Sequence, residues 1–193
     1  MELKIGPQMD SKKKILFIAN ALPELKLKTD TSLALAESAL ENDYAVYWCE
    51  KEDIVYMGHE IVIQRHSVVK KITAEQVEHT ASEGSLLFQE FSACFIRTDP
   101  PFDDSYRDMC WILNTQTHVP IYNSPASLLN FHEKSLHWRA QAEGFLQNEE
   151  SIPTCVAEHV STFESFILSK PISQTSQFVV KPFHFQIKFL YNL

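Results

Sequence analysis

The sequence predicts an α/β fold with a mostly parallel sheet, because short apolar runs alternate with amphipathic segments along the chain. The apolar runs KILFIA and YAVYWC stand on either side of the amphipathic stretch LALAESALE. Strands that are buried on both faces read as continuous apolar runs, whereas helices that cover them carry apolar residues at three- to four-residue spacing. This order of strand, helix and strand is typical of a parallel βαβ unit.

Two strands and one helix are expected in the first fifty residues. The apolar runs at 14–19 and 44–49 are short and rich in strand-forming residues, which indicates buried strands. Between them, the residues Thr29 to Ser32 supply capping oxygens for a helix over 33–41. Leu33, Ala36 and Leu40 share one face of that helix.

The segment that follows the second strand is expected to form a hairpin rather than another strand and helix. Residues 54–57 and 60–69 are apolar runs joined by a Gly-His turn, and this pattern indicates a hairpin. Residues 71–90 are weakly patterned, so we expect them to pass over the surface. A further buried strand is expected at 91–96.

Helices and strands alternate again in the second half of the chain. A helix is expected over 105–116, with Asp103 or Asp104 as its N-cap and an apolar face made of Tyr106, Met109, Cys110 and Leu113. The remaining expected strands lie at 118–123, 151–158 and 176–182. Three further helices are expected. One begins at Pro125, the second spans 133–145 and ends at Gly144, and the third spans 160–169 with Ser161 or Thr162 as its cap.

Composition excludes several classes of function. Apolar residues make up 45% and charged residues 22% of the 193 residues, as in ordinary globular proteins. A net charge of -8 argues against a nucleic-acid or anionic-membrane surface. We expect a cytoplasmic protein, because the chain shows no signal peptide and no membrane-length apolar run. The four cysteines form no CxxC pair, so we expect buried, reduced thiols rather than a zinc or redox motif.

The loop FIRTDPPFDD is the first candidate site. In open parallel sheets, ligands bind outside the carboxyl ends of the strands, and this loop leaves an expected strand there. Pro100 and Pro101 stiffen the loop, which would hold Arg97 ready for a carboxylate. The alternative is structural: Arg97 pairs with Asp99 or Asp103, the prolines make a rigid turn, and an aspartate caps the next helix.

Two lysines are candidates for binding phosphate. Lys134 lies in the stretch HEKSLH, which is no zinc helix, because His132 and His137 are five residues apart and so about 140° from each other around a helix. Lys134 is either solvated or directed at phosphate. Lys181 closes the apolar run FVV, and a lysine in that place is costly without an anionic partner.

Five motifs occur in the order found in bacterial glutathione synthetases, and the chain resembles that family from about residue 13 to residue 182. They are KTDTS (28–32), RTDPPFD (97–103), NSPASL (123–128), HEKSL (132–136) and FVVKP (178–182). The resemblance implies a Rossmann-like pre-ATP-grasp substrate domain over 13–123. It further implies the beginning of an ATP-grasp domain over 124–182, which is followed by an atypical tail over 183–193.

The resemblance also implies chemistry and partners. Such enzymes use ATP and Mg²⁺ to phosphorylate the carboxylate of γ-glutamylcysteine, and the amine of glycine then displaces the phosphate. Arg97, Asp30 and Ser32 correspond to substrate-side positions, although helix capping explains Asp30 and Ser32 equally well. Lys134 and Lys181 correspond to the lysines that hold nucleotide phosphates. The implied partners are γ-glutamylcysteine or a glutathione-like peptide and, because family members commonly assemble, further copies of the chain.

The chain departs from the family pattern in two places. His132 stands where the family has asparagine, and no glycine follows Gly144, whereas the family continues into a glycine-rich loop and acidic Mg²⁺ ligands. No catalytic residue and no metal ligand are therefore assigned, and we expect an incomplete ATP-grasp lobe that is inactive alone. The alternative hypothesis is a non-catalytic peptide-binding or subunit-contact module derived from this family.

Overall fold

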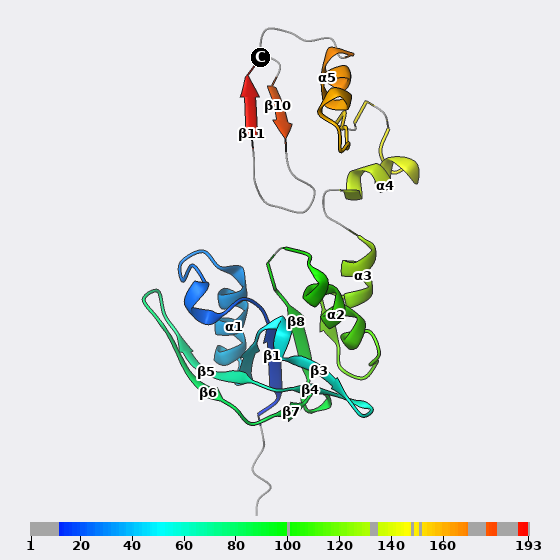
Figure 1. The fold of residues 1–193 in the computed structure, drawn as a ribbon. Coiled ribbons are helices and arrows are strands. Elements are labelled where there is room, and N and C mark those ends of the chain that lie inside the picture. The colour runs from blue at the N-terminus through cyan, green and yellow to red at the C-terminus, as the bar shows by residue number, and fades with distance from the viewer. Residues whose placement is uncertain are drawn as a thin grey trace, which may run out of the picture. The chain divides into compact units, whose positions relative to one another are not determined.

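The computed structural model of the chain describes residues 12–99, 101–131, 135–147, 149–150, 152–169, 177–180 and 189–192. Two compact units make up the chain, Met1–Asn130 and Phe131–Leu193 (Figure 1). The division follows a short helix, a few residues beyond the expected domain boundary at 123. The functions expected for 13–123, 124–182 and 183–193 stay predictions.

A six-stranded sheet forms the centre of the first unit, in the order β6-β5-β2-β1-β8-β9. Its strands are β1 (Lys14–Ile18), β2 (Ala45–Cys49), β5 (His66–Ile72), β6 (Val77–Ser82), β8 (Ala93–Ile96) and β9 (Ile121–Tyr122). Strand β1 runs parallel to β2 and β8, and β8 runs parallel to β9, whereas β5 and β6 join antiparallel at one edge. The predicted α/β class with a mostly parallel sheet is confirmed.

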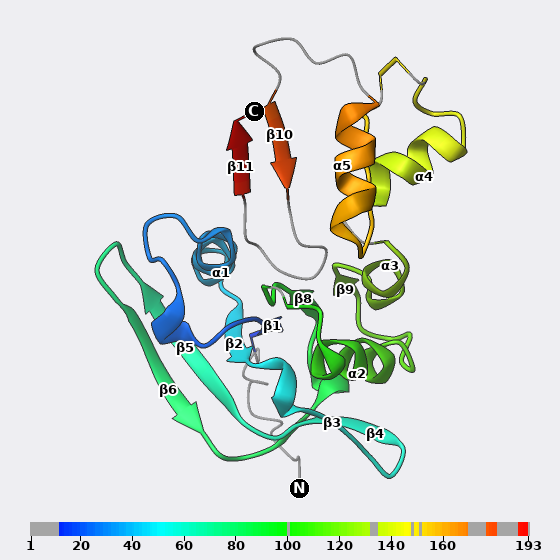
Figure 2. The same cartoon turned by 45° about the horizontal axis from the view of Figure 1, so that its top comes forward.

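Helices cover both faces of this sheet. Helix α1 (Thr31–Glu41) packs on one face, over β1, β2 and β5. Helices α2 (Asp104–Leu113) and α3 (Pro125–Asn130) lie on the other face, together with a small antiparallel sheet (Figure 2). That sheet consists of β3 (Ile54–Met57), β4 (Glu60–Ile63) and β7 (Leu86–Leu87). Short 3-10 helices at Leu22–Glu24, Lys51–Asp53 and Phe88–Glu90 complete the unit.

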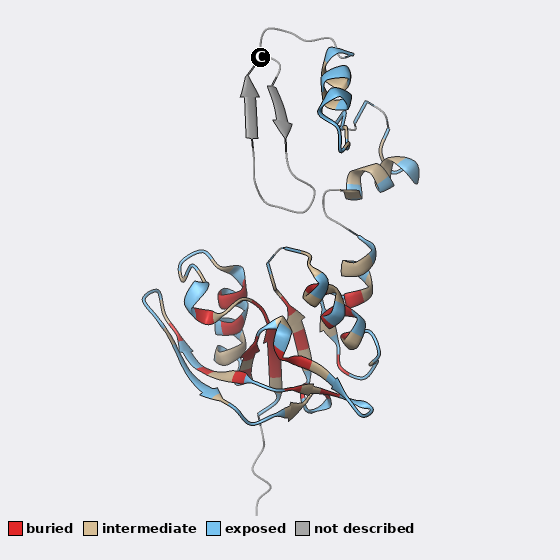
Figure 3. Ribbon diagram, in the orientation of Figure 1, coloured by how far each residue is buried: buried red, intermediate tan, exposed pale blue. Residues whose placement is uncertain are grey.

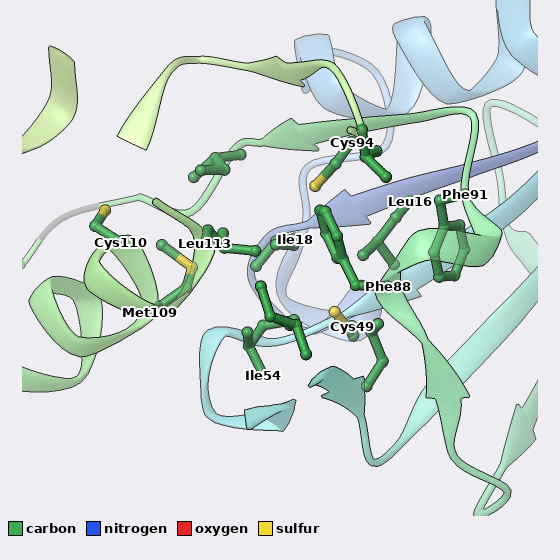
Figure 4. Close-up of a cluster of buried hydrophobic side chains, with 14 of the residues drawn as sticks. Leu16, Ile18, Cys49, Ile54, Phe88, Phe91, Cys94, Met109, Cys110 and Leu113 are labelled. Atoms are coloured by element: carbon green, nitrogen blue, oxygen red, sulfur yellow. The ribbon is translucent and has the colours of Figure 1, made fainter. Parts of the chain in front are cut away.

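The alternating side chains of β1 separate two hydrophobic cores. Ile15 and Phe17 pack with Leu33 and Ala36 of α1. Leu16 and Ile18 face the opposite way, toward a core that includes α2 and the small sheet (Figure 4). The face predicted for α2 is confirmed, because Tyr106, Met109, Cys110 and Leu113 are all buried. Buried residues in this unit concentrate on the central strands and the helix sides that cover them (Figure 3).

Two expectations for the middle of the chain are wrong. Residues 60–69 are not one strand, because the chain turns at Gln64 and Arg65 from β4 into β5, which belongs to the other sheet. Residues 71–90 do not merely pass over the surface, because they contain β6 and β7. Strand β6 lies at the sheet edge and is largely exposed, so it lacks the apolar alternation on which sequence prediction depends.

The turn between β3 and β4 and the N-cap of α2 lie where they were predicted. Gly58 lies at the turn between β3 and β4 with φ +70°, a conformation that glycine adopts without steric cost. Asp103 is the N-cap of α2, and its carboxylate accepts a hydrogen bond from the backbone N–H of Tyr106.

The second unit contains α4 (Leu136–Ala142), α5 (Val160–Leu168) and the antiparallel pair β10 (Gln177–Val180) and β11 (Phe189–Asn192). Helix α4 ends before Gly144, which has φ +78°. A strand was expected at 151–158, but residues 152–157 form no regular element, and the cap of α5 is His159 rather than Ser161 or Thr162.

The cysteines are free thiols, as expected. Cys49, Cys94 and Cys110 are buried, whereas Cys155 is only half-buried, which corrects the expectation of four buried thiols. Burial raises the pKa of Cys110 to about 11, so this thiol stays protonated at neutral pH. In the part of the chain that the structure describes, no helix has the length and apolar character needed to cross a membrane.

Candidate functional site

The carboxyl ends of β1 and β8 form a topological switch point. These strands are neighbours, yet the chain leaves β1 toward α1 on one face and leaves β8 toward α2 on the other (Figure 2). Loops that diverge in this way leave a crevice at the sheet edge, and ligands of open α/β sheets bind there.

Arg97 is the first residue after β8 and lies at this switch point. Its backbone N–H donates to the carbonyl of Ile18 at 2.7 Å, so the ladder between β1 and β8 continues to Arg97. Its Nε donates to Oγ of Ser32 at 3.2 Å, and its Nη2 donates to Oγ1 of Thr31 at 2.6 Å. The guanidinium is therefore held against the first turn of α1.

The first turn of α1 brings the other two predicted substrate-side residues to the same place. Oδ1 of Asp30 accepts hydrogen bonds from the backbone N–H groups of Ser32 at 2.8 Å and Leu33 at 3.2 Å. Asp30 is thus the N-cap of the helix, and Ser32 is buried beneath it. The structure brings Asp30, Ser32 and Arg97 together, although they lie up to 67 residues apart in sequence, and their role in binding stays a prediction.

The guanidinium of Arg97 has no acidic partner among the described residues. Within the described ranges no carboxylate forms an ion pair with Arg97, and its two side-chain partners are neutral hydroxyls. The structural alternative, in which Arg97 pairs with Asp99 or Asp103, is wrong on this point. Asp103 instead accepts from Lys51 Nζ at 2.7 Å, and the backbone N–H of Asp99 donates to Oδ1 of Asn20 at 3.0 Å.

An ion pair stabilises the neighbouring loop. The hydrogen bond from Lys51, with a second from the Tyr106 backbone, lowers the pKa of the Asp103 carboxyl to about 2. Lys51 follows β2 and its side chain is 12% exposed, so the pair links the end of β2 to the start of α2. The anionic side chain that was a candidate partner for Arg97 is therefore already neutralised.

Sequence reasoning missed three contributors to this edge of the sheet: Asn20, Thr31 and Lys51. Asn20 and Lys51 follow buried strands closely, in the same way that Arg97 follows β8. A search for polar residues at every strand end would have found them. Thr31 lies in the KTDTS motif and was expected only as a capping residue, because its contact with Arg97 depends on the approach of a strand that is distant in sequence.

The described residues contain no group of three or more His, Cys, Asp or Glu side chains that could hold a metal ion. Lys134 and Lys181, the predicted nucleotide-binding residues, lie outside the described residues, as do Pro100 and His132. What the described geometry offers chemically is a guanidinium at the switch point that donates to two hydroxyls and pairs with no described carboxylate. A planar guanidinium suits a carboxylate because it can donate two parallel hydrogen bonds.

Comparison with known proteins relates this chain to proteins named glutathione synthetase. A family model described as prokaryotic glutathione synthetase, N-terminal domain, matches residues 14–128. A protein named glutathione synthetase from Wigglesworthia glossinidia brevipalpis is 26% identical over 166 residues, which cover 83% of this chain and 51% of that protein. Proteins of the same name from Ralstonia nicotianae and Prochlorococcus marinus are 26% and 27% identical over 63% and 78% of this chain. The chain spans about half of the length of these relatives, or less.

Proposed function

Because the chain belongs to the family of the prokaryotic glutathione synthetase N-terminal domain, we propose that it is a glutathione synthetase-like chain whose first unit binds γ-glutamylcysteine. The observation that carries the proposal is the uncompensated guanidinium of Arg97, held by Ser32 and Thr31 at the switch point of the sheet. In this proposal residues 13–123 form the substrate domain, and residues 124–182 begin the ATP-grasp domain.

Arg97 would bind a carboxylate of the peptide. The two hydroxyl partners hold the side chain in place but do not neutralise its charge, so the remaining N–H groups are available for an anionic ligand. Hydrogen bonds between a guanidinium and a carboxylate are charge-assisted and therefore stronger than those between neutral groups. A preorganised side chain also loses little conformational entropy when the ligand binds.

ATP and Mg²⁺ belong to the proposal at the level of the family. ATP would supply the phosphate that activates the peptide carboxylate, and Lys134 and Lys181 would contact the nucleotide phosphates. The described residues provide no metal-binding cluster, so no step of the reaction is assigned to them.

Titration calorimetry with γ-glutamylcysteine tests the role of Arg97. We expect Arg97→Ala to lower the affinity roughly tenfold to a hundredfold, since a hydrogen bond to a charged group contributes about 1.5 to 3 kcal/mol. Arg97→Lys keeps the charge but loses the planar fork, so it should restore only part of the affinity. Arg107→Ala is the matched control, because Arg107 lies on the surface of α2 and pairs with Asp104. Equal affinities for the wild type and Arg97→Ala would remove Arg97 from the site.

A second candidate function is a peptide-binding module without ligase activity. It is favoured by one observation: the three predicted substrate-side residues all lie within the first unit, which contains the segment that matches the family model. Phosphate release from ATP, measured with Mg²⁺, γ-glutamylcysteine and glycine, separates the two candidates. Peptide binding without phosphate release would favour the module.

A further inference from the structure

Four aromatic side chains form a continuous row across the sheet. Trp48 of β2, Phe17 of β1, Phe95 of β8 and Tyr122 of β9 occupy paired positions on adjacent strands. Their rings stack in sequence, with centroid separations of 5.4 Å, 5.1 Å and 5.2 Å and interplanar angles of 10°, 13° and 26°. All four side chains therefore project from the face that α1 packs against.

The row is covered at one end and open at the other. Trp48 is 3% exposed and Phe17 is fully buried, whereas Phe95 is half-buried and Tyr122 is 54% exposed. Helix α1 covers the strands that carry Trp48 and Phe17. The ring of Tyr122 thus presents an apolar surface to solvent, and its stacking on Phe95 holds it in place.

The open end of the row lies beside Arg97. Phe95 and Arg97 are two residues apart in extended chain, so their side chains leave the same face of the sheet. Tyr122 pairs with Phe95 on the next strand, which places the Cα atoms of Arg97 and Tyr122 roughly 8 Å apart by strand geometry. A fully extended dipeptide spans roughly 7 Å, which is comparable to this Cα separation, so a small peptide has about the size needed to contact both side chains.

We propose that Tyr122 is a specificity-determining residue that contacts the cysteinyl side chain of the peptide whose carboxylate binds Arg97. This proposal rests on the proposed function and adds to it the group that selects the side chain of the ligand. A thiol is polarizable and only weakly polar, so it makes favourable contacts with an aromatic ring. The guanidinium and the ring together suit a ligand that carries an anionic group and a small apolar group a few bonds apart.

Calorimetry with two peptides tests the proposal. γ-Glutamylglycine lacks the thiol-bearing side chain of γ-glutamylcysteine and otherwise offers the same charged groups. We expect the wild type to prefer γ-glutamylcysteine and Tyr122→Ala to bind it roughly two- to tenfold more weakly, as expected for a sulfur–aromatic contact. Affinity for γ-glutamylglycine should stay unchanged in Tyr122→Ala.

Two variants serve as controls. Tyr122→Phe keeps the ring and should keep the preference for γ-glutamylcysteine. Tyr56→Ala removes a tyrosine of similar exposure, 48%, from strand β3 and should behave like the wild type. Thermal melting of each variant shows whether it is folded, and Tyr122→Leu provides an apolar side chain without a ring if Tyr122→Ala is unstable.

The outcomes separate this inference from the proposed function. If the wild type binds γ-glutamylcysteine through Arg97 but Tyr122→Ala and Tyr122→Leu both keep the full preference over γ-glutamylglycine, the role of Tyr122 is refuted and the proposed function stands. If the wild type binds neither peptide, the proposed function fails and this inference fails with it. If Arg97→Ala binds as well as the wild type, Arg97 is removed from the site and this inference is refuted.

Discussion

Nζ of Lys51 lies 2.7 Å from both carboxylate oxygens of Asp103, and this ion pair joins the end of β2 to the N-cap of α2. The same ion pair takes up the Asp103 carboxylate, which was a candidate partner for the guanidinium of Arg97. Because Asp103 is paired with Lys51, it does not neutralise the guanidinium of Arg97 at the switch point.

The Lys51–Asp103 pair predicts a pH dependence of stability. The pKa of Asp103 is about 2 in the folded chain and 3.8 for an unperturbed aspartate, so the unfolded chain takes up the proton first. The stabilisation is present above about pH 4 and is lost as the pH falls toward 2. Asp103→Asn keeps the capping ability but lacks the charge. Urea unfolding at several pH values should show a stability gap between wild type and Asp103→Asn that narrows from pH 5 to pH 2, and a constant gap would contradict the prediction.

Substitutions of Asp30 can separate its role as the N-cap of α1 from a role in ligand binding. Both capping bonds go to Oδ1, and among the described residues no hydrogen bond to Oδ2 is present. Asp30→Ala should lower the free energy of unfolding by about 1 kcal/mol, whereas Asp30→Asn keeps the cap and should be close to the wild type in stability. If Asp30 contacts the peptide, Asp30→Asn should still bind γ-glutamylcysteine roughly threefold to tenfold more weakly. Wild-type affinity in Asp30→Asn would assign Asp30 to capping alone.

We expect the buried side chain of His66 to make the folded chain less stable on mild acidification. It is 8% exposed, its ring packs against Tyr47, and its Nδ1 has no hydrogen-bond partner among the described residues. Burial, with the nearby charge of Lys14, lowers the pKa of His66, while Asp53 partly opposes the shift. The unfolded chain therefore takes up a proton near pH 6.5 while the native state resists it, so stability falls as the pH drops below about 6.5.

The variant His66→Phe keeps an aromatic ring against Tyr47 and cannot be protonated. Chemical denaturation between pH 7.5 and 5 should show a shallower loss of stability for this variant than for the wild type. Parallel losses in both proteins would show that other groups cause the acid sensitivity.

Helix α1 offers a matched test of the core on its side of the sheet. Leu33 is 1% exposed and packs with Phe17 and Val46, whereas Leu35 is 43% exposed on the same helix. Leu33→Ala should lower the free energy of unfolding by about 2 to 5 kcal/mol, because it leaves a cavity. Leu35→Ala should change it by about 0.5 kcal/mol or less. Similar losses for both variants would contradict the packing of α1.

The central elements could be predicted from sequence because their signals are local. KILFIA and YAVYWC are apolar enough to specify buried strands, and the spacing of Tyr106, Met109, Cys110 and Leu113 specifies the buried face of α2. Strand β6 could not be predicted in this way. It is an exposed edge strand, and its pairing with β5 comes from backbone hydrogen bonds that leave little trace in side-chain pattern.

The candidate site also combines features that the sequence predicts with features that it does not. Sequence pattern and family resemblance selected Arg97, Asp30 and Ser32, since each occurs in a motif that can be read along the chain. The identity of Arg97's partners, the diversion of Asp103 to Lys51 and the aromatic row that ends at Tyr122 were decided by tertiary structure alone. Sequence determines which side chains are available and which local element carries each of them. The distances between side chains far apart in sequence depend on strand order and register, which arise only when the whole sheet is assembled.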